Sequence, residues 1–189
     1  MAEKKLDKYR VAILATDLFE KAELIEPRKA LQEAGAHVSV VAPKSGEIQA
    51  VQHDKRTQKV KVDMTLDQVK PTEFDAVLLP GGAMNADALR MEKKAQEFVQ
   101  SIDRDGKPIA VICHGPWLLI SAGLVQGRHM TSYKTIQDDL KNAGANWVDE
   151  ASVRDRNWVS SRQPSDIPQF NKAMIELFSE SQQKIHKAA

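Results

Sequence analysis

The residue best suited to covalent chemistry in this sequence is its single cysteine, Cys113. It stands in an Ile-Cys-His-Gly-Pro run at 112–116, after an apolar segment and before a helical pattern. Gly115 permits a close backbone approach, and Pro116 suits the first turn of a helix. A cysteine on such a strand-to-helix turn takes the place of the serine in a nucleophile elbow, where the helix N-terminus favours its thiolate. The alternative is a buried structural cysteine. The strand-end position and the adjacent histidine favour the nucleophile.

Two consecutive glycines, Gly81 and Gly82, follow a second apolar run and a proline. Glycines let backbone N–H groups face inward without obstruction by side chains. The N–H groups of Gly82 and His114 are therefore predicted to form an oxyanion hole for a tetrahedral intermediate. By itself a Pro-Gly-Gly run indicates only a turn.

Two glutamates, Glu20 and Glu23, follow the first apolar run. Glu20 is expected to point at the thiol of Cys113. An ionised carboxylate there would raise the thiol pKa, whereas a protonated one that donates a hydrogen bond would stabilise the thiolate. The two groups would then titrate as a pair. The alternative is that both glutamates complement the dipole of the following helix, and we assign Glu23 to that role.

The histidines offer one candidate for proton transfer, His114, which can act as a general base if another residue orients its ring. The others show no ligand spacing with Cys113, so we expect no metal and no cofactor; they are His37, His53, His129 and His186. Trp147 and Trp158 are expected to pack in the core or at an interface.

The elements that must position these loops follow from the apolar pattern. Short runs that are apolar on both faces are typical of buried parallel strands. They occur at 11–15, 38–42, 76–79 and 109–112, with further strands expected at 59–62 and 157–160. Helical patterns cover 24–34, 86–104, 116–122, 135–143 and 167–179. Alternating strands and helices predict a doubly wound α/β sandwich, in which ligands bind at the carboxyl ends of the strands.

The length of 189 residues fits one domain spanning 1–189, with frayed tails expected at about 1–8 and 181–189. The formal net charge of +1 gives no bulk electrostatic reason to expect nucleic acid as a partner. The apolar runs are too short to span a bilayer, and the first residues lack the apolar stretch of a signal peptide. A single cysteine excludes an internal disulfide, which is consistent with a cytoplasmic location.

Taken together, these loops resemble the PfpI-type intracellular protease family, within the class I glutamine amidotransferase-like superfamily. The resemblance covers about residues 11–178 in order. The matching segments are FEKAEL at 19–24, FDAVLLPGG at 74–82, GKPIAVICHGP at 106–116, TSY at 131–133 and NWVSSRQPSD at 157–166.

The resemblance implies a flavodoxin-like three-layer sandwich with a mainly parallel sheet, a nucleophile at Cys113, a partner histidine at His114 and an acid at Glu20 that hydrogen-bonds the thiol. Similar proteins form dimers or rings with active sites at subunit contacts, where an acidic residue of a neighbouring subunit completes a triad. The best match for that residue is Asp87, in a loop one residue longer than the family pattern. Tyr133 is expected to line the site.

The family resemblance leaves the activity open between two classes. One is a stress-response cysteine hydrolase, either a protease or amidase or a deglycase that acts on glyoxal-modified groups, with a small carbonyl compound or a peptide as substrate. The other is a non-catalytic oxidative-stress sensor or holdase chaperone with an oxidisable Cys113. Thiolate attack on a carbonyl, covered by an oxyanion hole, is the first step common to the enzymes.

Overall fold

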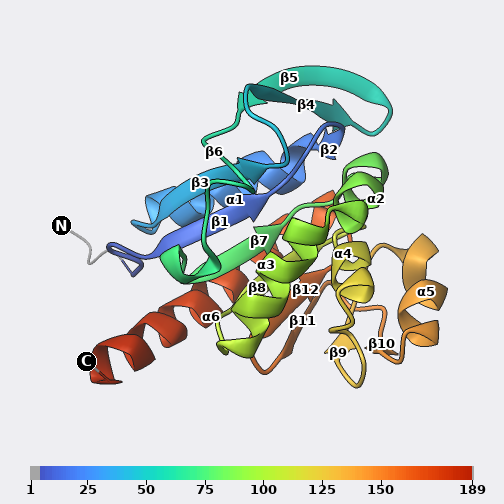
Figure 1. Cartoon of the computed structure of the whole chain (residues 1–189). Helices are drawn as coiled ribbons and strands as arrows, with labels where there is room; N and C mark the ends of the chain where they lie inside the picture. The colour runs from blue at the N-terminus through green and yellow to red at the C-terminus, as the bar shows by residue number, and fades with distance from the viewer. Residues whose placement is uncertain (1–4, 189) are drawn as a thin grey trace.

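A seven-stranded sheet forms the centre of the protein, and six of its strands run parallel (Figure 1). The computed structural model describes residues 5–188, without the side chains at 185, 186 and 188. Only the pairing of β11 with β12 is antiparallel. In spatial order the strands are β11 (Ser152–Asp155), β12 (Trp158–Ser161), β8 (Ile109–Ile112), β7 (Ala76–Leu79), β1 (Arg10–Leu14), β3 (His37–Ala42) and β6 (Met64–Thr65).

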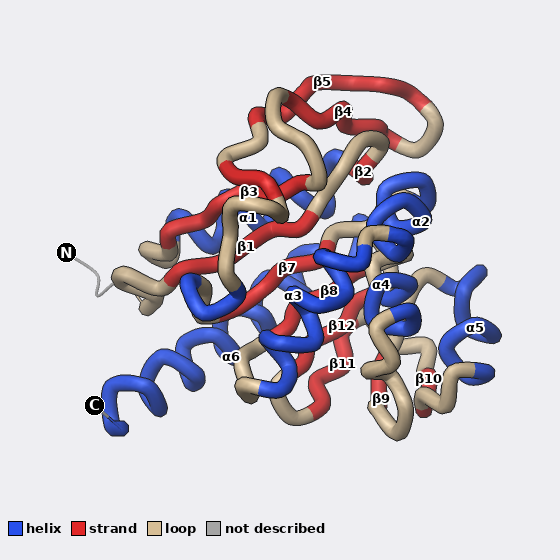
Figure 2. Tube along the Cα trace, in the orientation of Figure 1, coloured by secondary structure: helices blue, strands red, loops and turns tan. Residues whose placement is uncertain are grey.

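Helices cover both faces of this sheet (Figures 1 and 2). α1 (Lys21–Glu33) and α6 (Ile167–Ala188) pack together on one face, and α2 (Ala83–Met91), α3 (Lys93–Arg104) and α4 (Pro116–Ser121) pack on the other. Successive side chains of β1 alternate between the two layers: Ile13 joins the cluster that contains Phe170, and Leu14 joins the one that contains Phe98. Because both layers are apolar, the strands read as continuous hydrophobic runs. The predicted three-layer α/β sandwich with a mainly parallel sheet is confirmed.

Two smaller sheets accompany the central one. β2 (Phe19–Glu20), β4 (Glu47–Gln52) and β5 (Lys55–Lys61) form one, and β9 (His129–Met130) pairs with β10 (Asn146–Trp147), next to α5 (Gln137–Asn142), in the other. The strand expected at 59–62 therefore lies mainly in the β4–β5 hairpin and not in the central sheet.

One sequence expectation about the helices needs correction. The helix predicted over 86–104 is two helices, because Glu92 has an extended ψ of 104°. Gln96 Nε2 donates to the carbonyl of Arg90 at 2.7 Å, which supplies a hydrogen bond at the break. In the described parts of the tails, α6 continues to residue 188 and Leu6 is fully buried, while the expected fraying stays a prediction. Residues 1–4 and 189 lie outside the described part.

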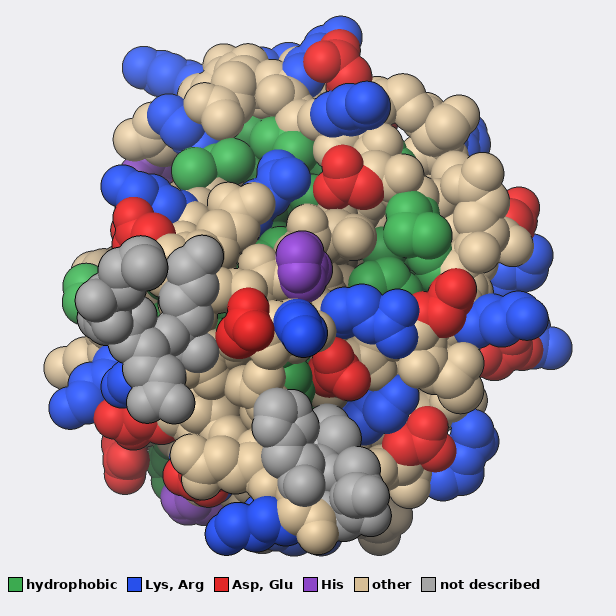
Figure 3. Space-filling model, turned by 90° about the vertical axis from the view of Figure 1, so that its left-hand side faces the viewer, with side chains coloured by type: hydrophobic (Ala, Val, Ile, Leu, Met, Phe, Trp, Pro, Cys, Tyr) green, Lys and Arg blue, Asp and Glu red, His purple; other side chains and the backbone are tan. Residues whose placement is uncertain are grey.

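Figure 3 shows the face of the protein on which both ends of the described chain lie. Positive and negative side chains are interspersed on this face. No patch of one charge dominates this face. Among the described helices, none is long and apolar enough to cross a membrane.

Candidate active site

Cys113 lies on the sharp turn between β8 and α4, as the sequence predicts. Its φ of 62° is in the left-handed region, which costs free energy for a residue with a side chain and occurs often at active sites. Its N–H donates to Ser161 O at 3.1 Å, and its carbonyl accepts from the Tyr133 N–H at 2.9 Å. A Cβ on Gly115 would lie 2.7 Å from Leu79 O, so the turn needs glycine there. These contacts fix the sharp turn that carries Cys113.

Burial raises the pKa of the Cys113 thiol, and hydrogen bonds from two backbone N–H groups, those of Gly82 and His114, to its sulfur offset part of that rise. They are the pair expected to form an oxyanion hole. Gly82 has a φ of 89°, and a Cβ there would lie 2.6 Å from Leu18 O. A Cβ on Gly81 would lie 2.6 Å from the Cβ of Cys113. The two glycines therefore let the loop after β7 approach the thiol closely.

The acid beside the thiol is Glu23, whereas Glu20 was the expected one. Glu23 is fully buried, hydrogen-bonds the Cys113 side chain and accepts from the Gly81 N–H at 2.8 Å. Glu20 directs its carboxylate to the N–H of His53 at 3.0 Å, because β2 pairs with β4 there. The sequence did contain a signal: Glu23 precedes buried Pro27 and Leu31 at a spacing of four residues, on the inward face of α1.

Burial raises the pKa of Glu23 to about 8. Burial and an ionised Glu23 also raise the pKa of the Cys113 thiol. A protonated Glu23 has the opposite effect, since it removes the repulsion and can donate to the sulfur. The two groups therefore titrate as one pair, and the protonation state of Glu23 decides whether a thiolate is stable.

His114 lies beside Cys113, with its Nδ1 3.2 Å from the sulfur. Its ring stacks on Tyr133 with a centroid distance of 5.0 Å, and its Nε2 lies 3.4 Å from Thr135 Oγ1. Burial lowers the pKa of His114, which keeps its imidazole neutral at neutral pH and able to accept a proton. Tyr133 and Thr135 therefore orient the ring, a condition that the sequence left open.

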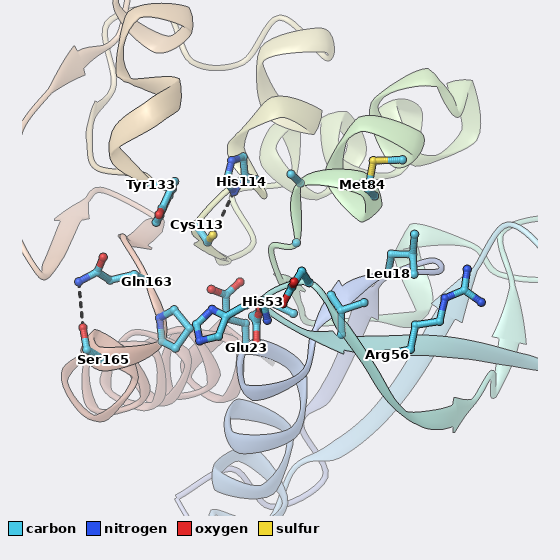
Figure 4. A pocket seen from close by; sticks show the side chains of 16 residues that line it. Leu18, Glu23, His53, Arg56, Met84, Cys113, His114, Tyr133, Gln163 and Ser165 are labelled. Atoms are coloured by element: carbon cyan, nitrogen blue, oxygen red, sulfur yellow. Dashed lines mark hydrogen bonds between the residues drawn. The ribbon is translucent and has the colours of Figure 1, made fainter.

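A cavity of about 690 Å³ opens above the thiol (Figure 4). Cys113 and His114 project into it from one side, while Arg56 and Leu18 lie at one end and Gln163 and Ser165 at the other. Its remaining lining residues are Glu20, Glu23, Val51, His53, Asp54, Gly82, Ala83, Met84, Tyr133 and Pro164. Sequence reasoning missed the contribution of the β4–β5 hairpin, because no local motif marks it. Residues 163–165 lie in the segment 157–166 that carries the family resemblance, but sequence reasoning assigned them no place in the site.

Asp87, the expected third member of a triad, is not in this cavity within the single chain. It is exposed on α2. Its neighbours on the exposed side include Met84 and Met91, which are 62% and 80% exposed. Within the described residues, no group of three or more His, Cys, Asp or Glu side chains is arranged to hold a metal ion.

The model of the "DJ-1/PfpI family" matches residues 9–177 of this sequence. The chain belongs to the DJ-1/PfpI family. It is 45% identical over 168 residues to "Deglycase TK1284" of Thermococcus kodakarensis, covering 89% of this chain and 98% of that one. It is 39% identical to "Putative cysteine protease YraA" of Bacillus subtilis, covering 89% and 97%.

A crystal structure from Anabaena variabilis contains a DJ-1/ThiJ/PfpI-like and a ferritin-like domain, and it matches with a TM-score of 0.83 at 36% identity. The match covers 89% of this DJ-1/PfpI chain and 48% of that two-domain protein. The family predicted from the three loops is therefore confirmed. The names of the two relatives agree with the expected class of enzyme, a PfpI-family hydrolase or deglycase.

Proposed function

We propose that this DJ-1/PfpI protein is a stress-response, cysteine-dependent hydrolase that removes glyoxal-derived modifications from amines or cleaves an amide bond. The observation that supports this most is the environment of the Cys113 sulfur. Two backbone N–H groups, Glu23 and the His114 imidazole surround it at the base of a cavity open to ligands. This arrangement fits thiolate attack on a carbonyl and stabilisation of the resulting oxyanion.

The reactive form is a pair in which Glu23 holds the one proton and Cys113 is the thiolate. The thiolate adds to the substrate carbonyl carbon, and the carbonyl electron pair moves to oxygen, which the Gly82 and His114 N–H groups stabilise. With an amide, collapse of this intermediate expels the amine, which takes the proton held by Glu23, and leaves a thioester. Water then attacks the thioester while His114 accepts its proton, the acid and the Cys113 thiolate are released, and the proton returns from His114 to Glu23.

The test compares the wild type with Cys113→Ser on two substrates, a peptide carrying a methylglyoxal-modified lysine and an unmodified peptide amide. Release of the unmodified peptide or of the amine is followed by mass spectrometry. If one substrate is turned over by the wild type and not by Cys113→Ser, the proposal is supported. That substrate then shows whether the protein removes glyoxal-derived modifications or cleaves amide bonds. Equal background rates for both proteins on both substrates would refute it, and would leave an oxidation sensor or holdase as the alternative role.

We further propose that the protein assembles as a homodimer or ring and acts in the cytoplasm, with Asp87 of a neighbouring subunit near His114. Exposed Met84 and Met91 beside Asp87 support a subunit contact on α2, because large exposed apolar side chains often mark interfaces. Mixing Cys113→Ser with Asp87→Asn subunits tests this. If Asp87 acts across the contact, mixed oligomers regain activity that neither variant has alone. A mixture that stays inactive, or a monomer in light scattering, contradicts it.

A further inference from the structure

Asn85 is a fully buried polar residue on α2 for which the proposed chemistry has no role. Its Oδ1 accepts from the N–H of Thr16, just after β1, at 2.7 Å. Its Nδ2 donates to the carbonyls of Pro80 at 3.2 Å and Gly81 at 2.9 Å. The amide side chain thereby uses both of its N–H bonds and its oxygen to fasten the loop after β7 to the end of β1.

The Gly81 carbonyl and the Gly82 N–H belong to the same planar peptide group. The carbonyl end accepts from Asn85 Nδ2 and from the Glu20 N–H at 3.2 Å, while the N–H end points at the Cys113 sulfur. Hydrogen bonds to the carbonyl hold the peptide plane and polarise it, which makes its N–H a stronger donor. Between two glycines such a plane turns over easily unless something holds it.

We propose that Asn85 is a positioning residue for the reaction, which fixes the Gly81–Gly82 peptide so that the Gly82 N–H aims at the sulfur and at the oxyanion that forms there. The proposal rests on the proposed function for its catalytic consequence. Its effect on the stability of the Cys113 thiolate is expected whether or not any substrate is turned over. Asn85 itself does not contact the thiol, and it is not among the residues that line the cavity above it.

Two variants test it: Asn85→Leu, which keeps a similar volume, and Asn85→Ala, a good helix former that leaves a small gap. In both, the pH midpoint of Cys113 alkylation by iodoacetamide is expected to rise, because a weakly held N–H stabilises the thiolate less. On the substrate that the wild type turns over, kcat is expected to fall about 10- to 100-fold with KM within about twofold. Asn142→Leu, an exposed change of the same type, is the control and should match the wild type.

Thermal unfolding of each variant separates positioning from simple stability. A lower Tm together with an unchanged alkylation midpoint and unchanged kcat, measured well below that Tm, would overturn the proposal. If the wild type turns over neither substrate and the Asn85 variants still show a raised alkylation midpoint, the positioning of the Gly82 N–H is supported and the proposed function is refuted. The two failures are therefore distinguishable.

Discussion

The carboxyl group of Glu23 and the sulfur of Cys113 are hydrogen-bond partners in the interior, brought together from α1 and from the turn after β8. Gly81 lies between them: a Cβ there would be 2.4 Å from Glu23 Oε2 and 3.0 Å from the sulfur. The other oxygen, Oε1, has no hydrogen-bond partner among the described residues. This pair sets the protonation state on which the proposed chemistry depends.

Glu23→Gln is expected to make Cys113 less reactive. A glutamine cannot take up the thiol proton, so the pH midpoint of alkylation should move up to the ordinary thiol value of about 8.5 or higher. The rate at pH 7 should fall about tenfold or more, measured with iodoacetamide on the single cysteine. Glu26→Gln, an exposed change on the same helix, serves as the matched control. An unchanged profile in Glu23→Gln would show that the thiolate does not depend on this acid.

The pH dependence of stability should differ between the wild type and Cys113→Ser. In the serine variant Glu23 keeps a raised pKa near 8, so between about pH 4.3 and 8 the folded state binds one proton more than the unfolded state. Its free energy of unfolding should therefore fall as pH rises, by at most about 1.4 kcal/mol per pH unit.

In the wild type the thiol releases a proton on folding while Glu23 takes one up, so the two contributions cancel. Urea unfolding at pH 5, 6, 7 and 8 measures how the free energy of unfolding of each protein changes with pH. All other titrating groups are the same in the two proteins, so they do not contribute to the difference between the two slopes. Parallel curves for the two proteins would mean that the folded wild type holds the thiol protonated, contrary to the proposed pair.

Gly81→Ala should abolish activity and lower stability. The added methyl would overlap Glu23 and the Cβ of Cys113, and overpacking of this kind costs about 1–3 kcal/mol. Gly46→Ala is the control, because its φ of 103° is strained for alanine but its surroundings are open. That variant should lose about 1 kcal/mol or slightly more and keep full activity. Retained activity in Gly81→Ala would contradict the close packing of the loop on the thiol.

A buried polar cluster away from the active site should matter for stability alone. Asp103 Oδ1 accepts from Arg128 and from the Trp158 indole, each at 2.7 Å, and from Asn157 at 3.1 Å. Asp103→Ala leaves the buried Arg128 charge without this partner, which should cost about 3 kcal/mol or more. Urea unfolding measures the loss, and activity of the folded protein should stay unchanged. Asp105→Ala, at an exposed ion pair, should cost less than about 1 kcal/mol.

The parts of the site that the sequence predicts well are those with local causes. The apolar run before Cys113, followed by Gly115 and Pro116, specifies a strand, a tight turn and a helix start within ten residues. Parallel strands end at one edge of the sheet, so the convergence of this turn with the loop of Gly81 and Gly82 follows from the fold class. The same reasoning placed the N–H groups of Gly82 and His114 together.

The sequence alone determined the family, the sandwich and the position of Cys113, because short-range patterns and turn chemistry encode them. Tertiary structure decided which acid meets the thiol: Glu20 and Glu23 are three residues apart, and only the pairing of β2 with β4 turns Glu20 toward His53. It also decided that Asn85 links the glycine loop to the end of β1, since its hydrogen-bond partner there, Thr16, is 69 residues away along the chain. Contacts of such long range depend on how whole elements pack, and no local spacing carries that information.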